Sequence, residues 1–214
     1  MIKKSAALAN MKLDVLDSTK ASAIIKSCDE ILENKLQDQF IFDAINSGAG
    51  TALNMNINEV LANRALEILG MTKGEYDVIS PNDHLNMSQS SNDTFPTAMH
   101  VAIIINRLAT ISELDDLVRS LQRTAIEFND AIKIGRTHLI DALRVTLGIE
   151  FGECAYSLEI AKKKLYQAVD NLTYIGLGGT AVGTGVNSPR RFRQLAISLL
   201  SEISGLDLKP SLNV

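Results

Sequence analysis

Apolar side chains recur at helical spacing along most of the chain, and this periodicity predicts a mostly α-helical fold. The first run covers residues 2–16, and Ser18 then offers an N-cap for a second helix that continues to Leu32. A third run covers residues 57–69 and stops at Gly70, as expected of a helix C-terminus. The pattern therefore predicts three helices before residue 71.

The middle of the chain begins with an irregular segment and then returns to helices. Residues 71–92 are rich in Gly, Pro, Asn, Asp and Ser, which predicts turns and loops. Pro96 suits a first helical turn, and a long apolar helix is predicted over residues 98–108. A further amphipathic helix is predicted over residues 112–132, with its run ended by Gly135.

A heptad seam of apolar residues predicts one more long helix. The seam alternates spacings of four and three through Leu147, Phe151, Cys154, Leu158, Ala161, Leu165, Ala168 and Leu172. Such a seam is typical of bundle or coiled-coil packing, and it favours assembly of several subunits. Packing within a single chain is the alternative, because periodicity does not tell whose helix faces the seam.

Composition places the chain among ordinary globular proteins. Apolar residues make up 46% of it and charged residues 21%, which excludes a disordered chain, a collagen-like repeat or a disulfide-rich miniprotein. The 21 basic and 25 acidic residues give a formal charge of −4, so nucleic acid is not an expected partner. Apolar runs are too short for a membrane helix and no signal-peptide pattern is found, so we expect a cytoplasmic protein without a membrane partner.

Cysteines and histidines give no sign of a metal site. Cys28 and Cys154 fall on apolar helical stripes and are expected to be buried, reduced thiols. The three histidines, His84, His100 and His138, lack the short spacings of a zinc site. We therefore expect neither a metal nor another cofactor.

The glycine-rich segment 176–185 has two interpretations. Its glycines suggest a nucleotide-binding loop, but it follows an amphipathic helix where a dinucleotide fold would have a buried strand. It also lacks the Gly-Lys-Ser/Thr ending of a phosphate loop. A tight helix-to-helix connection with close backbone packing is the better prediction.

Three short polar segments are candidates for binding an anion. They are Gly50-Thr51 with Asn54, residues 88–93, and residues 135–138. Each places hydroxyl or amide donors beside a predicted helix end, where free N–H groups and the helix dipole favour a carboxylate. The alternative is structural, because Ser90 to Asp93 can simply cap a helix and His138 can be an ordinary hydrogen-bonding residue. Arg136 can likewise pair with a surface carboxylate.

The sequence around these segments is similar to the signature blocks of the fumarase/aspartase superfamily. Four blocks follow in the family's order: residues 50–63 (GTALNMNINEVLAN), 88–97 (SQSSNDTFPT), 135–142 (GRTHL and DA around residue 140) and 177–185 (LGGTAVGTG). The resemblance covers nearly the whole chain. It implies that residues 1–92 are part of a helical N-terminal domain with active-site loops, and that residues 93–214 are the start of the long-helix central bundle, which is incomplete here. It also implies a homotetramer with active sites shared between subunits.

Members of this superfamily add or remove a small group across the double bond of fumarate: ammonia from L-aspartate, water from L-malate, or larger amines. Proton abstraction next to a carboxylate builds a doubly charged aci-carboxylate, which fixed donors stabilise as the charge develops. By matching positions, the carboxylate that becomes the aci form is expected to be held by Thr51, Ser90 and Ser91, with Asn54 in the same substrate-binding set. The leaving-group side is expected to be contacted by Asn92, Thr137 and His138, of which Thr137 and His138 are the catalytic candidates.

Small differences between the blocks favour one branch of the superfamily. Ala49 before Gly50-Thr51 is typical of aspartases, and Ser80 replaces the histidine of the fumarase secondary anion site. Ser91 and residues 95–101 are closer to fumarases. Aspartate ammonia-lyase, which converts L-aspartate to fumarate and ammonia, is the favoured assignment, with fumarate hydratase as the alternative.

Two departures from the family pattern affect the expected activity. Ile140, Arg144 and Ile149 stand where the family commonly has Gln, Pro and Gln. The Gly-Ser-Ser loop that carries the family's base serine has no match in these residues. We therefore expect a fragment of a lyase that is inactive alone; a complete, non-catalytic helical assembly module is the competing hypothesis.

Overall fold

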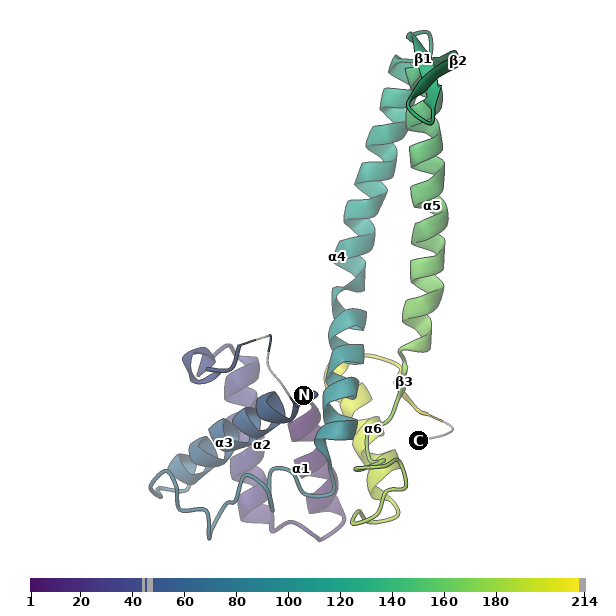
Figure 1. Ribbon diagram of the computed structural model, residues 1–214. Coiled ribbons are helices and arrows are strands. Elements are labelled where there is room, and N and C mark those ends of the chain that lie inside the picture. Colours follow the sequence, from purple (N-terminus) through teal and green to yellow (C-terminus); the bar gives the residue numbers. More distant parts are fainter. Residues whose placement is uncertain (44, 46–47, 212–214) are drawn as a thin grey trace. The chain divides into compact units, whose positions relative to one another are not determined.

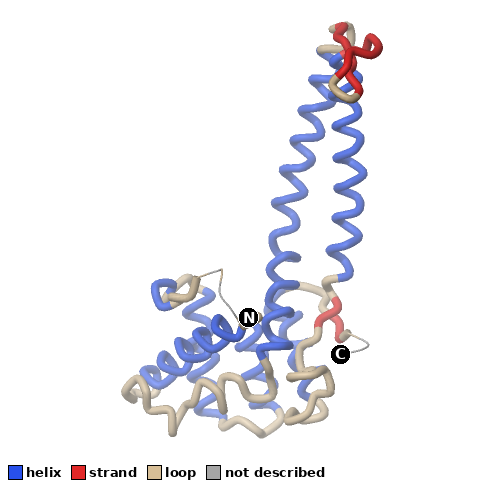
Figure 2. The backbone as a smooth tube through the Cα atoms, in the orientation of Figure 1, coloured by secondary structure: helices blue, strands red, loops and turns tan. Residues whose placement is uncertain are grey.

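The computed structural model describes residues 1–43, 45 and 48–211 and confirms a mostly helical chain (Figures 1 and 2). The helices are α1 (Ile2–Lys12), α2 (Ser18–Leu32), the 3-10 helix η1 (Gln37–Gln39), α3 (Thr51–Ile68), α4 (Ser91–Glu127), α5 (Leu147–Asn171) and α6 (Phe192–Ser204). The strands are β1 (Ile132–Thr137), β2 (Ile140–Thr146), β3 (Tyr174–Ile175) and β4 (Lys209–Pro210). No helix of the described residues is long and apolar enough to cross a membrane.

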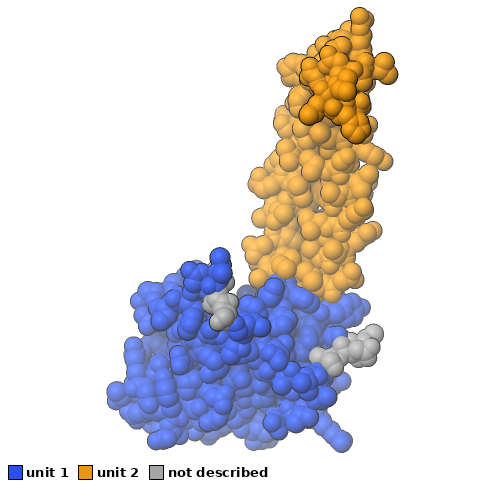
Figure 3. All heavy atoms as spheres, in the orientation of Figure 1, with its two compact units in different colours: residues 1–101, 173–214 blue, residues 102–172 orange. Residues whose placement is uncertain are grey.

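The chain divides into two compact units, shown in Figure 3. The first contains residues 1–101 and 173–214, of which 44, 46, 47 and 212–214 are not described, and the second contains residues 102–172. The predicted domain boundary after residue 92 stays a prediction about the whole protein.

The core of the first unit lies between α1, α2 and α3. Leu16, Ile24, Leu61, Leu66 and Ile79 are almost fully buried in this cluster, which burial of apolar surface stabilises. Helix α6 packs against α1, and β3 pairs in parallel with β4. Cys28 is buried in the same cluster, as predicted.

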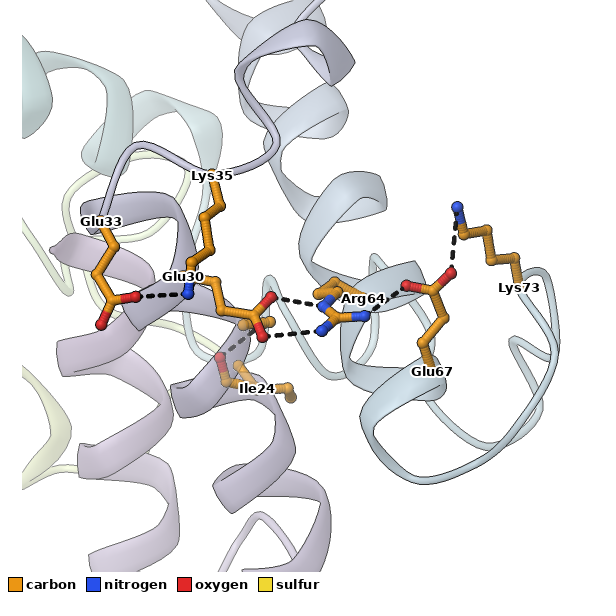
Figure 4. Close-up of polar contacts among 8 residues, drawn as sticks. Ile24, Glu30, Glu33, Lys35, Arg64, Glu67 and Lys73 are labelled. Atoms are coloured by element: carbon orange, nitrogen blue, oxygen red, sulfur yellow. Dashed lines mark hydrogen bonds and ion pairs between the residues drawn. The ribbon is translucent and has the colours of Figure 1, made fainter.

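A chain of charged side chains links α2 to α3 on the surface of this unit (Figure 4). The Arg64 guanidinium donates to both carboxylate oxygens of Glu30, at 2.5 and 2.8 Å, and to Glu67 at 3.0 Å. Lys73 in turn pairs with Glu67 at 3.2 Å. These contacts lower the pKa of Glu30 and of Glu67, chiefly through the hydrogen bonds from Arg64.

Two helix starts differ from the prediction. Asp17, not Ser18, is the N-cap of α2, and its carboxylate accepts the backbone N–H groups of Thr19 and Lys20. Helix α3 begins at Thr51, six residues earlier than predicted, because its first two turns bury asparagines and so lack an apolar stripe. Gly70 follows the end of α3 with φ of 76°, as predicted for a helix C-terminus.

The two helices predicted over residues 98–108 and 112–132 are one, α4, which begins at Ser91. Pro96 lies at its sixth position rather than in its first turn. The alternative that Ser90 to Asp93 cap a helix is confirmed, because Ser90 Oγ accepts the N–H of Asn92 at 3.2 Å and Asp93 accepts the N–H of Ser90 at 2.9 Å. This reciprocal arrangement has the form of a capping box.

A β-hairpin stands where the sequence predicted a helix end at Gly135. Strands β1 and β2 pair antiparallel, with Ile132 opposite Thr146 and Thr137 opposite Ile140. The two-residue turn consists of His138 (φ 50°) and Leu139 (φ 62°), the positive φ pair of a type I′ turn. The hairpin escaped prediction because such turns normally carry Asn-Gly or Asp-Gly.

Helix α5 is confirmed over Leu147–Asn171, but no residue of the predicted heptad seam is buried. The buried positions are Gly148, Ala155 and Val169, each one residue after a seam position. A Cβ on Gly148 would lie 2.4 Å from the Ala125 carbonyl oxygen of α4, so these helices approach closely there. Cys154 on the seam is exposed, so its predicted burial is wrong for the described chain.

Candidate functional site

Helix α3 and the first turn of α4 bring two predicted substrate-binding residues into contact. The side-chain amide of Asn54 donates to Ser91 Oγ at 2.8 Å, and Thr94 Oγ1 donates to Asn54 Oδ1 at 3.3 Å. Asn54 is 4% exposed, so its amide is held in a fixed orientation by the packing around it. Because Ser91 Oγ accepts from Asn54, its own O–H is free to donate to a bound anion.

Thr51 belongs to the same region through its neighbour Gly50. Gly50 has φ of 85°, and a Cβ there would lie 2.2 Å from the ring of Phe95, one turn after Ser91. Only glycine therefore allows the start of α3 to approach α4 so closely. Thr51 follows as the exposed first residue of α3. The sequence also predicts a loop centred on residues 47–51, of which Ser47 lies outside the described residues.

The glycine-rich segment is anchored to the start of α4 by Asp93. The Asp93 carboxylate accepts the N–H groups of Gly178 at 3.1 Å and Thr180 at 2.9 Å, besides that of Ser90. Burial raises the pKa of Asp93, an effect that these backbone hydrogen bonds oppose. The segment connects α5 to α6, and a Cβ on Gly178 would lie 2.8 Å from the Arg193 side chain. The predicted tight connection is therefore confirmed.

This anchor also orients Asn92. Its side-chain amide nitrogen donates to the Ala181 carbonyl at 2.8 Å, which leaves Oδ1 as the free end of the side chain. An amide oxygen accepts hydrogen bonds and does not donate them. Asn92 thus offers an acceptor, which suits a donor such as an ammonium group.

A buried polar network centred on Asn86 supports the hydroxyl cluster, which consists of Thr51, Ser90 and Ser91. Its Oδ1 accepts from Asn54 at 3.2 Å, from Asn58 at 3.4 Å and from the Lys3 ammonium at 3.1 Å. Lys3 also donates to Gln89 Oε1 at 3.1 Å. Burial lowers the pKa of Lys3 to about 7, against the opposing attraction of Asp93.

Thr137 and His138 lie in the second unit, at the turn of the β1–β2 hairpin. Both side chains are exposed, and the hairpin beside them is closed by an ion pair between Arg136 and Asp141 at 2.9 Å. The alternative that Arg136 pairs with a surface carboxylate is confirmed. Ile140, opposite Thr137, is 69% exposed.

The first unit therefore brings Asn54, Ser90, Ser91 and Asn92 together at the start of α4, and Thr51 begins α3 directly after Gly50, which packs against Phe95 of α4. The cluster consists of uncharged donors at a helix start, with one acceptor beside them, a combination that binds a carboxylate and stabilises developing negative charge. Among the described residues, no group of three or more His, Cys, Asp or Glu side chains is placed to hold a metal.

Sequence reasoning missed Lys3 and Asn86, which support the cluster without belonging to a recognisable motif. Lys3 had one detectable signal: it lies on the same helical face as Ala7 and Asn10, which are buried. A lysine in a buried stripe calls for a polar partner. Asn86 had no comparable signal within the irregular segment.

Comparisons with known proteins agree with the four sequence blocks. The model of a protein family described as lyase matches residues 1–214. An aspartate ammonia-lyase of Corynebacterium glutamicum is 47% identical over 97% of this chain and 40% of its own length. A class II fumarate hydratase of Thermosynechococcus vestitus is 45% identical over 99% of this chain and 46% of its own length.

Solved structures include a similar fold. A fumarate lyase:delta crystallin from Brucella melitensis, solved bound to cobalt, superposes with a TM-score of 0.88 at 44% identity. The match covers 99% of this chain and 46% of that one. The chain thus spans less than half the length of these relatives.

Proposed function

Because this chain belongs to the lyase family, we propose that the whole protein is an aspartate ammonia-lyase that interconverts L-aspartate with fumarate and ammonia. The observation that carries the proposal is the hydroxyl cluster at the start of α4, with Ser91 held as a donor by Asn54. Such donors meet the requirement of a reaction in which negative charge develops on a carboxylate.

In this proposal, Thr51, Ser90 and Ser91 bind the carboxylate next to the carbon that loses a proton. Loss of that proton leaves two negative charges on the carboxylate, which becomes the aci form. Donors that already point at this carboxylate stabilise the added charge without reorganisation. The carbon–nitrogen bond then breaks, the electron pair leaves with nitrogen, and fumarate and ammonia remain.

The orientation of Asn92 suits an ammonium group on the leaving-group side of the substrate. Its exposed Oδ1 accepts a hydrogen bond from the ammonium group of L-aspartate, which can only donate. Thr137 and His138 of the second unit are proposed to contact the leaving group of a substrate in the assembled whole protein. The base serine is expected from the Gly-Ser-Ser loop, which these 214 residues do not contain.

Fumarate hydratase is the second candidate, because a class II fumarate hydratase is 45% identical to this chain. We also propose that the whole protein is a homotetramer. The second unit supports assembly, because large apolar side chains on α4 and α5 remain exposed, among them Leu108 at 64% and Tyr156 at 64%.

The test follows fumarate by ultraviolet absorbance with L-aspartate and L-malate offered separately. The chain is assayed alone and then with a polypeptide that supplies the family's Gly-Ser-Ser segment. We expect no turnover alone and aspartate-dependent fumarate after complementation, with Ser91→Ala lowering the rate by about a hundredfold. Malate turnover instead would assign a hydratase, and turnover by the chain alone would show that the base lies elsewhere.

A further inference from the structure

Lys3 is a buried cation that is hydrogen-bonded to neutral groups. Lys3 is 8% exposed, and among the described residues no carboxylate forms an ion pair with it. Its ammonium is held only by the amide oxygens of Asn86 and Gln89. Asp93 exerts a favourable long-range attraction, but its carboxylate already accepts three backbone N–H groups.

A neighbouring lysine shows that this arrangement is particular to Lys3. Lys4, the next residue of α1, pairs directly with Asp29 of α2 at 2.5 Å. Folding normally pairs a buried charge because an isolated one costs several kcal/mol. An unpaired lysine beside a cluster of uncharged donors therefore points to a negative charge that arrives with a ligand.

The distance between Lys3 and the cluster is short enough for this. Successive hydrogen bonds of 3.1, 3.2 and 2.8 Å join the Lys3 ammonium to Asn86, Asn86 to Asn54 and Asn54 to Ser91. The ammonium and the Ser91 hydroxyl are thus at most about 9 Å apart. The four groups all lie within the first unit.

We propose that Lys3 is a positioning residue that compensates the charge of a dicarboxylate bound at Thr51, Ser90 and Ser91. Its positive charge attracts the dicarboxylate over a distance, because Asn86 and Asn54 lie between the Lys3 ammonium and Ser91. Lys3 itself does not contact the ligand. The inference rests on the proposed function, because it takes the hydroxyl cluster as the dicarboxylate site.

The magnitude follows from Coulomb's law. One unit charge about 9 Å from another, in surroundings of effective dielectric about 20, changes an equilibrium constant about 20-fold. Removal of the Lys3 charge should therefore weaken dicarboxylate binding by about 20-fold, whereas a variant that keeps the charge should bind within about threefold of wild type.

The test titrates the 214-residue chain with fumarate at about pH 6, below the pKa of about 7, where the Lys3 ammonium is protonated, and follows the backbone amide signals of Ser90 and Ser91 by NMR. Lys3→Met removes the charge and keeps the length of the side chain, while Lys3→Arg keeps the charge. Lys4→Met is the matched control, since it removes a lysine of the same helix that is paired with Asp29. We expect about 20-fold weaker binding for Lys3→Met only.

A second variant distinguishes charge compensation from a purely structural role of Lys3. Asn86→Asp places a carboxylate on the Lys3 ammonium, so it satisfies the buried cation while cancelling its charge. A purely structural role predicts that this variant binds fumarate as wild type does. Charge compensation predicts weaker binding, by a factor approaching that of Lys3→Met.

Two outcomes would overturn the inference, and they are distinguishable. If Ser91→Ala abolishes fumarate binding while Lys3→Met and Asn86→Asp bind as wild type does, the site stands and Lys3 has no part in it. If the wild-type amides of Ser90 and Ser91 do not respond to fumarate, the hydroxyl cluster is not the dicarboxylate site, and the proposed function fails with the inference.

Discussion

The buried ammonium of Lys3 makes the stability of the chain depend on pH in a predictable direction. Burial lowers its pKa from 10.5 in the unfolded chain to about 7 in the folded one. Between these two values the unfolded state holds a proton that the folded state does not. The free energy of unfolding therefore rises with pH across this window, and below about pH 7 the full penalty for the buried charge is present.

The size of the effect follows from proton linkage. One proton released on folding changes the unfolding free energy by about 1.4 kcal/mol per pH unit. From about pH 6 to about pH 9, Lys3 should thus add about 2.7 kcal/mol to the stability of the wild-type chain. Lys3→Met lacks this contribution, although it also loses the hydrogen bonds to Asn86 and Gln89, which give an offset that does not vary with pH.

The assay is urea denaturation followed by circular dichroism at several pH values between those limits. The quantity of interest is the wild-type stability minus that of Lys3→Met, because all other titrating groups occur in both proteins and cancel. Lys4→Met, which removes an ion pair at 2.5 Å on the same helix, should retain the wild-type slope. A difference that stays constant within about 0.5 kcal/mol would refute the assignment of a buried, weakly basic Lys3.

Three further predictions concern the backbone turns and the charged link between α2 and α3, and each is checked by urea denaturation. Leu139→Gly should stabilise the chain by about 1 kcal/mol, because Leu139 is 97% exposed and its φ of 62° is unfavourable for a residue with a side chain. Leu143→Gly on β2 is the control and should destabilise the chain. Equal effects of the two substitutions would contradict strain at the turn. Gly178→Ala should lower the free energy of unfolding by more than about 2 kcal/mol, since its Cβ would collide with the Arg193 side chain. Gly74→Ala, where φ is 89° but the space around the Cβ is open, should lower it by about 1 kcal/mol. Arg64→Met should lower the free energy of unfolding by about 1 kcal/mol at neutral pH. The difference should shrink as pH falls through the lowered pKa values of Glu30 and Glu67, because their protonation removes the ion pairs. A loss of stability that does not depend on pH would exclude the ion pairs as its cause.

Helices with a clear apolar stripe were predictable from the sequence. Helix α5 begins at Leu147, where its heptad seam starts, and α2 ends at Leu32, as its apolar run predicts. The β-hairpin was not predictable in the same way. His138 and Leu139 take a turn conformation that their side chains disfavour, so no local signal marks it.

The candidate site was predictable only in part, for a related reason. Hydroxyl and amide residues before a helix are recognisable as caps or anion ligands, and this identified Ser90, Ser91 and Asn92. The contacts that orient them are tertiary. Asp93 meets the glycine-rich segment 85 and 87 residues further along the chain, and no periodicity encodes such a pairing.

In helix α3, the buried asparagines that belong to the candidate site also explain why the apolar pattern predicted the helix start six residues too late. Asn54, Asn56 and Asn58 are all buried there, and burial of amides in a helix is unfavourable unless they are hydrogen-bonded. Asn54 and Asn58 both donate to Asn86, while Oδ1 of Asn56 and of Asn58 has no partner among the described residues. A sequence under selection for stability alone would place apolar residues at these positions. Their burial is explained if Asn54 is needed to orient Ser91, because a donor held in advance loses little freedom when the ligand binds.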